Sequence, residues 1–292
     1  MVNLMLSWQQ AAVLAAGLGA AGMLLVRAGH TAGGAAGHAL QDGDRTRLRE
    51  VAGRWGAHVG PFAREAGVVI GLYALWQLAG NLAAGGFHDA IGHAWWIWHA
   101  ERSLHLPSEL AVQHLVLPRA LLSRMANMYY ATMHFGMLIA MLIWLFARHR
   151  DGYPAVRNAM AASTAICLLV SLIPVAPPRM LSSLGFVDLA ARYGESVYSV
   201  VGSAAGADQL SAMPSVHVAW SLLVAWAIVT RGTGRWRWLI VAHPVVTVLV
   251  VVATGNHYWA DGIVAAAIVM AVLSVQALLT GSVGRARKLP GA

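Results

Sequence analysis

Apolar segments long enough to cross a membrane recur along this chain and alternate with short polar stretches. A membrane-spanning helix needs roughly 17 to 25 mostly apolar residues. Seven segments reach or approach that length, namely residues 8–26, 66–86, 126–147, 159–176, 215–230, 238–254 and 258–280. The pattern therefore predicts an all-α fold, a polytopic membrane helical bundle.

The first apolar segment is separated from the others by a long polar stretch. No Lys or Arg precedes it, which favours a retained helix over a cleaved signal peptide. We expect an accessory transmembrane helix and cytoplasmic linker over residues 1–65. A membrane-embedded core of six helices would follow over residues 66–284, and a cytoplasmic tail over residues 285–292.

Residues 87–125 are too polar to span a membrane but are rich in tryptophan and histidine. Trp95, Trp96 and Trp98 fall close together, and indole rings prefer the level of the lipid headgroups. We expect short amphipathic helices lying in the interface. The histidines of this region are interpreted as polar residues at headgroup level: His88, His93, His99, His105 and His114.

Composition supports a membrane protein and excludes other classes. Of the 292 residues, 58% are hydrophobic and only 11% are charged, whereas soluble domains average roughly 25% charged residues. The net charge of +8 comes from short loops between apolar segments, so a nucleic-acid partner is not expected. Cys167 is the single cysteine and rules out a disulfide within the chain. The sequence does not define an oligomeric state.

The basic residues predict the orientation in the membrane. Fifteen of the twenty Lys and Arg residues fall on the side of the 27–65 loop, and five on the other side. The positive-inside rule places the richer side in the cytoplasm. The poorer side, which carries Arg179, His217, His257 and Asp261, then faces outward. We expect an integral protein of the plasma or inner membrane with an extracytoplasmic site.

Two residues at the start of the last apolar segment carry chemistry. His257 and Asp261 are four residues apart, so on a helix they share one face. A carboxylate can hold the Nδ1 proton of an imidazole and leave Nε2 as a nucleophile or base. Ionisable groups at membrane depth are functional candidates because leaving them in lipid is costly. A structural His–Asp pair that closes a bundle is the alternative.

The stretch Ser211-Ala212-Met213-Pro214-Ser215-Val216-His217 opens the fifth apolar segment. It reads as a loop that turns into a helix with polar residues in its opening turn. The free N–H groups and the positive dipole end of such a helix favour an anion. Backbone N–H groups around Ser215 are therefore candidates for binding phosphate.

A third polar stretch, Pro174-Val175-Ala176-Pro177-Pro178-Arg179-Met180, follows the fourth apolar segment. Its prolines stop the helix and stiffen the exit, and the guanidinium of Arg179 suits a phosphate dianion. His217, His257 and Asp261 also have the ligand types of a zinc site. The nearby arginine disfavours a cation, so we expect no metal and no cofactor.

Together, the PPR, PSVH and NHYWAD stretches make the chain resemble the type-2 phosphatidic acid phosphatase superfamily, and within it the inositol phosphorylceramide synthase-like branch. The resemblance extends from about Trp98 through Ala271. It implies a six-helix phosphotransferase core that acts on a lipid. It also implies that His257 is the nucleophile, Asp261 its orienter, His217 the acid for the leaving oxygen and Arg179 the phosphate-binding cation.

The chain departs from the superfamily pattern at positions that bear on charge. The superfamily has a lysine where this chain has Leu172, and a Ser-Arg pair where it has Val250-Val251. Val216 stands where the superfamily has glycine. Two cationic contacts to phosphate are therefore missing, and other residues would have to help neutralise the substrate.

Residues before and along the third apolar segment are candidates for that help. Asn127, Tyr130 and His134 fall at i, i+3 and i+7, which is one helical face. We hypothesise that Tyr130 and His134 line the same pocket, with Arg102 as a second cation. Hydrogen bonding between helices is the alternative interpretation.

The expected activity is cleavage of a lipid phosphoester with transfer of the phosphoryl group, bare or carrying a head group, to an acceptor. Water as acceptor would make the protein a simple lipid phosphate phosphatase, and an alcohol would make it a head-group transferase of the inositolphosphotransferase type. The missing cations favour the transferase, because a diester donor carries less charge. A lipid or anion transporter and a vanadate-dependent oxidant are more distant alternatives.

Overall fold

The computed structural model describes residues 7–35, 59–75, 78, 87–193 and 210–286. The chain divides into two compact units, Met1–Leu78 and Ala79–Ala292. The first unit contains the first apolar segment, and the second contains all of the candidate site residues. The three-part division expected from the sequence stays a prediction.

Two helices form the described part of the first unit, α1 (Trp8–Ala35) and a helix over residues 59–75. They approach each other through glycine. A Cβ atom on Gly67 would lie 2.8 Å from the carbonyl oxygen of Ala15 and 2.8 Å from the backbone nitrogen of Gly19. The two backbones are therefore in direct contact, as in membrane helix pairs with small residues at the interface.

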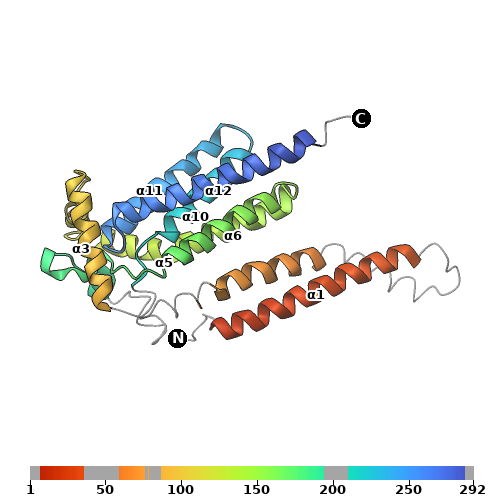
Figure 1. Cartoon of the computed structure of the whole chain (residues 1–292), viewed down its shortest axis with the longest axis horizontal. Coiled ribbons are helices and arrows are strands. Elements are labelled where there is room, and N and C mark those ends of the chain that lie inside the picture. The colour runs from red at the N-terminus through yellow and green to blue at the C-terminus, as the bar shows by residue number, and fades with distance from the viewer. Residues whose placement is uncertain (1–6, 36–58, 76–77, 79–86, 194–209, 287–292) are drawn as a thin grey trace. The chain divides into compact units, whose positions relative to one another are not determined.

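The second unit is a bundle of long helices with shorter helices at one end (Figure 1). Its longer elements are α3 (Phe87–Ser103), α4 (Glu109–Val116), α5 (Ala120–Arg148), α6 (Tyr153–Val170), α10 (Val216–Arg231), α11 (Ala242–Ala253) and α12 (Trp259–Ala286). Helix α10 packs against α5, α6, α11 and α12. It is therefore the central helix of the bundle, and its first turn carries His217.

The apolar pattern is confirmed as a polytopic helical bundle. Each predicted segment contains a helix among its described residues, and the β pairing of the described residues is limited to one isolated bridge, between Val175 and Ser211. Within the described part of the chain, four helices are long and apolar enough to cross a membrane: Gln9–Arg27, Ala120–Arg148, Arg235–Ala253 and Trp259–Thr280. Helix α10 is apolar but shorter. The short helices predicted over residues 87–125 correspond to α3 and α4.

Prolines set two helix boundaries that hydropathy placed elsewhere. Helix α6 ends at Val170, six residues before the predicted end, because the residue before a proline is disfavoured in the α conformation and Pro174 follows. The sixth apolar segment begins as a 3-10 helix, η4 (Arg235–Val241), and continues as α11. Pro244 has no N–H to donate one turn back, which accounts for the change in helix type.

Candidate active site

Two segments that are distant in sequence pair side by side and bring the PPR and PSVH stretches together. The N–H of Val175 donates to the carbonyl of Leu210 at 2.6 Å, and the N–H of Ala212 donates to the carbonyl of Val175 at 3.1 Å. The stretch before Arg179 therefore lies directly beside the stretch before His217.

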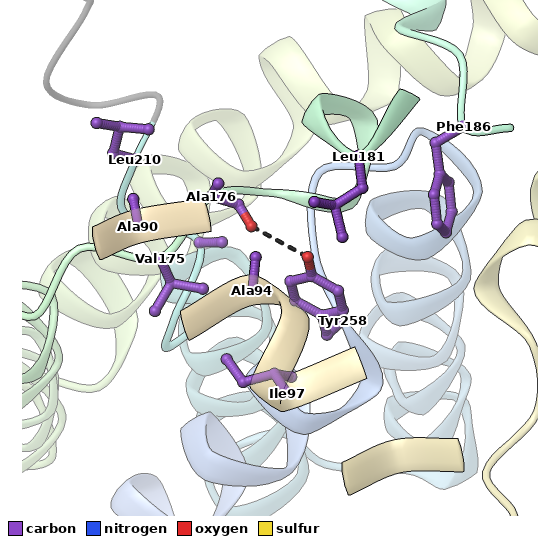
Figure 2. Close-up of a cluster of buried hydrophobic side chains, with 10 residues drawn as sticks. Ala90, Ala94, Ile97, Val175, Ala176, Leu181, Phe186, Leu210 and Tyr258 are labelled. Carbon is purple, nitrogen blue, oxygen red and sulfur yellow. Dashed lines mark hydrogen bonds between the residues drawn. The ribbon is translucent and has the colours of Figure 1, made fainter. Parts of the chain in front are cut away.

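Helix α3 and the NHYWAD stretch (residues 256–261) pack onto these paired segments through a buried apolar cluster (Figure 2). The small side chains of Ala90 and Ala94 allow a close approach, and the N–H of Ala176 donates to the carbonyl of Ala90 at 3.0 Å. The hydroxyl of Tyr258 points at the carbonyl oxygen of Ala176 and donates to it at 3.1 Å (Figure 2). Tyr258 thereby fixes the neighbouring His257 beside the segment that leads into the PPR stretch.

His257 is buried and is oriented by two acceptors. Its Nδ1 lies 2.7 Å from the carbonyl oxygen of Ala212 and 3.1 Å from Oδ2 of Asp261. A carbonyl oxygen accepts hydrogen bonds and never donates them, so Nδ1 carries the proton. A neutral imidazole with its proton on Nδ1 has its lone pair on Nε2.

Asp261 connects the NHYWAD stretch to the PSVH stretch. Its Oδ2 accepts the backbone N–H of Tyr258 at 2.9 Å, and its own carbonyl accepts the N–H of Ser215 at 3.2 Å. Ser215 is the N-cap of α10, where its Oγ accepts the N–H of Val218 at 3.4 Å. Asp261, whose carboxylate orients His257, is thus hydrogen-bonded through its backbone to the start of α10, which carries His217.

His217 lies next to His257 and is enclosed by rings of α5. The centroids of the two imidazoles are 5.8 Å apart, with an interplanar angle of 60°. Tyr130 stacks on His217 at 4.3 Å and 18°, and His134 lies at 4.1 Å and 56°. The structure therefore brings Tyr130 and His134 to His217, and their role in lining a substrate pocket stays a prediction.

Arg179 lies in a 3-10 turn, η1 (Pro178–Met180), that follows Pro177. Its guanidinium donates from Nη1 to Oδ1 of Asn256, and its Nε lies 3.4 Å from Oδ2 of Asp188. Its backbone N–H also donates to the carbonyl of Gly255 at 2.9 Å. Arg179 is therefore held against the residues that immediately precede His257.

Asn127 and Arg102, which were also proposed for the pocket, each have another partner in the structure. The amide of Asn127 donates to the carbonyl of Leu189 at 3.2 Å. Seven residues span about 10 Å along a helix, so Asn127 shares a face with His134 but lies at a different depth. Arg102 forms an ion pair with Glu109 at 3.0 Å, which occupies the charge that the hypothesis assigned to phosphate.

Sequence reasoning missed three polar residues that hold the site together, Glu101, Asp188 and Asn256. Asn256 and Glu101 fall within the stretches that carry the family resemblance, which was the available signal. Asp188 caps the short helix α7 (Leu189–Arg192) by accepting the N–H of Ala191 at 2.9 Å. Its contact with Arg179 depends on the tertiary fold, so no local pattern indicates it.

Across the described residues, the structure forms no group of three or more His, Cys, Asp or Glu side chains that could hold a metal ion. The chemistry that the arrangement itself supports uses a nucleophilic nitrogen on His257, a second imidazole on His217 and the guanidinium of Arg179, which is hydrogen-bonded to Asn256, the residue before His257. These are the parts needed to transfer a phosphoryl group.

The apolar helices indicate an integral membrane protein, and the two-histidine site has groups that phosphoryl transfer can use. The family model described as PAP2 superfamily matches residues 95–275, well over half of the chain. The protein therefore belongs to the PAP2 superfamily, as the resemblance predicted, and is a phosphatase-type lipid phosphoesterase. Comparison with curated proteins and comparison with solved structures gave no match.

Proposed function

We propose that this protein transfers the phosphoryl group of a lipid phosphoester through a phosphohistidine on His257. The environment of Nδ1 is the observation that supports this most strongly. With Ala212 and Asp261 both accepting from Nδ1, the lone pair is on Nε2, the atom that attacks phosphorus. The carboxylate also stabilises the positive charge that the ring gains on attack.

His217 is the acid and base of the proposed reaction. In the first step the bond from Nε2 of His257 to phosphorus forms and the bond from phosphorus to the lipid oxygen breaks. Protonated His217 gives its proton to that leaving oxygen. In the second step an acceptor hydroxyl gives its proton to neutral His217, its oxygen bonds to phosphorus, and the lone pair returns to Nε2.

The charge of the site favours a phosphodiester donor. Arg179 stabilises the phosphoryl oxygens, but its Nε lies 3.4 Å from Asp188, which offsets part of its charge. The positions at which relatives carry further cations hold Leu172, Val250 and Val251. A diester has one negative charge where a terminal phosphate has up to two, so it requires fewer cations.

We therefore propose head-group transfer of the inositol phosphorylceramide synthase type. The donor is a lipid phosphodiester, the intermediate on His257 still carries the head group, and the acceptor is an alcohol hydroxyl. The distribution of Lys and Arg between the loops supports an active site on the extracytoplasmic side of the plasma or inner membrane.

Product analysis tests this proposal. Purified protein in detergent with EDTA would be incubated with a phosphodiester lipid bearing an inositol head group, or with a phosphatidic acid. Each donor would be supplied with and without a lipid alcohol or a polyol, and the products would be identified by mass spectrometry. We expect transfer of the head group to the alcohol, persistence of activity in EDTA, and an acid-labile phosphoenzyme.

Three results would change the conclusion. Release of inorganic phosphate and diacylglycerol from phosphatidic acid, with no transfer from either donor to the added alcohol, would establish a simple phosphatase. Loss of activity in EDTA that zinc restores would establish a metalloenzyme. Full activity of the His257→Ala variant would refute the phosphohistidine mechanism itself.

A further inference from the structure

A buried carboxyl group on α3 caps the helix that carries Asp261. Glu101 is 1% exposed, and its Oε1 accepts the N–H of Ala260 at 2.7 Å. Ala260 is the second residue of α12, and the first N–H groups of a helix have no acceptor within that helix. Glu101 therefore supplies from another element the acceptor that an N-cap side chain would normally provide.

A second buried carboxyl, that of Glu109, lies close enough to Glu101 to interact with it. Glu109 is fully buried and pairs with Arg102 at 3.0 Å, so it is the ionised member of the pair. No donor points at Oε2 of Glu101 from the part of the chain that the structure describes. Burial, followed by the hydrogen bond to Glu109, raises the pKa of Glu101 from 4.5 to about 9. Glu101 is therefore protonated at neutral pH, which avoids a second negative charge beside Glu109.

The capped turn of α12 is connected directly to the reacting groups. Ala260 is followed by Asp261, whose Oδ2 lies 3.1 Å from Nδ1 of His257 and whose carbonyl accepts the N–H of Ser215 at 3.2 Å. A shift of this turn would move the orienting carboxylate away from His257. It would also loosen the start of α10, next to His217.

We propose that protonated Glu101 is a positioning residue that holds the first turn of α12 in the geometry required for the reaction of His257. This inference rests on the proposed function. The charged and titratable groups that face Glu101 are Arg102 on α3, Glu109 on α4, and Tyr258 and Asp261 at the start of α12. Loss of the Glu101 proton would place a second negative charge beside Glu109 and near Asp261, and like charges repel.

Two substitutions distinguish the role of the Glu101 proton from the role of Glu101 as the acceptor for the N–H of Ala260. Glu101→Gln keeps an acceptor oxygen for Ala260 and supplies a permanent N–H donor for Glu109, so it imitates the protonated acid. Glu101→Ala removes both. Asp89→Asn is the matched control, because Asp89 is an exposed carboxylate on the same helix.

The test is the dependence of kcat on pH from 6 to 10.5, with the head-group transfer assay. We expect wild type and Asp89→Asn to lose kcat as the pH rises through about 9, because the carboxyl then ionises. Glu101→Gln should keep kcat at pH 7 within about threefold and lose this alkaline decrease. Glu101→Ala should lose roughly tenfold or more in kcat at pH 7 with little change in KM.

The same alkaline decrease in Glu101→Gln and wild type would overturn the inference, as would an unchanged kcat in Glu101→Ala. If Glu101→Ala fails to fold, Glu101→Gln still decides the question. A wild type without turnover refutes the proposed function instead. The ¹⁵N resonance of His257 Nδ1 then provides an independent readout. It should shift near pH 9 in wild type and not in Glu101→Gln, and equal shifts in both would refute the positioning role.

Discussion

The Nδ1 atom of His257 lies 3.1 Å from Oδ2 of Asp261, and both side chains are buried. The same carboxylate oxygen accepts the N–H of Tyr258 at 2.9 Å, so its position is fixed by the backbone as well as by the imidazole. A carboxylate held in this way determines both the tautomer and the direction of the ring. Its removal should therefore affect the chemical step and not the binding of substrate.

The variant Asp261→Asn tests this relationship. The amide has no charge to stabilise the ring that becomes positive on attack, and its NH₂ group would compete with the proton that Ala212 holds on Nδ1. We expect kcat to fall by roughly 100-fold or more, with KM changed by less than about threefold. Rapid-quench measurement of the phosphoenzyme would locate the loss in its formation. Phosphoenzyme formation at the wild-type rate would contradict the role of Asp261.

His217→Asn should separate the attack on phosphorus from protonation of the leaving group. With an alkyl ester, loss of the acid should lower kcat by about 10²–10⁴-fold. With a nitrophenyl ester the leaving group needs no proton, so formation of the phosphoenzyme should fall only a few fold. Stopped-flow measurement of nitrophenolate release provides the comparison. An equal loss with both esters would show that His217 does not act as the acid.

The spans and the histidine motifs were predictable because hydropathy and helical spacing are local properties. His257 and Asp261 were predicted to share one helical face, but His257 precedes α12 (Trp259–Ala286), so their contact depends on the turn before the helix as well as on their spacing. The pairing of Val175 with Leu210 and Ala212, and the contact of Asp188 with Arg179, join segments that no spacing rule connects. Glu101 was not predicted as a functional residue, because its acceptor role depends on how α3 crosses the start of α12.

Gly255 occupies a position that no other residue fills without strain. Its φ is +69°, and a Cβ atom would lie 3.0 Å from Nε2 of Gln113 and 3.3 Å from Cβ of Arg179. We expect Gly255→Ala to lower the free energy of unfolding by about 1–3 kcal/mol. It should also lower kcat at least tenfold, because Arg179 is displaced. Denaturation in detergent micelles and steady-state kinetics would measure the two effects.

Gly234→Ala is the control for this prediction. Gly234 has a φ of +76° but nothing within 4 Å of the added Cβ, so it carries the backbone strain without the displacement of Arg179. We expect a loss of stability of about 1–2 kcal/mol and unchanged kcat. If the two variants lose activity equally, the effect of Gly255→Ala is one of stability alone.

Arg102→Ala should act on stability and not on recognition of phosphate. Arg102 donates to Glu109 at 3.0 Å and to the carbonyl of Pro107 at 2.9 Å. Removing it leaves Glu109 buried without its cation, which should cost about 2–3 kcal/mol. The KM for the lipid donor should change by less than about twofold. A large increase in KM with unchanged stability would instead place Arg102 at the phosphate.

His134→Ala tests whether the rings around His217 matter to catalysis. The rings of His134 and Tyr130 pack against His217 with centroids 4.1 and 4.3 Å away, so His217 has little freedom to turn away from His257. Removing His134 opens space on one side, and we expect kcat to fall by about tenfold with an alkyl ester. The loss should be smaller with a nitrophenyl ester, because the displaced group is the acid. Tyr130→Phe keeps the stacked ring and should retain kcat within about twofold. If His134→Ala keeps full turnover with both esters, these rings serve only to pack α5 against α10.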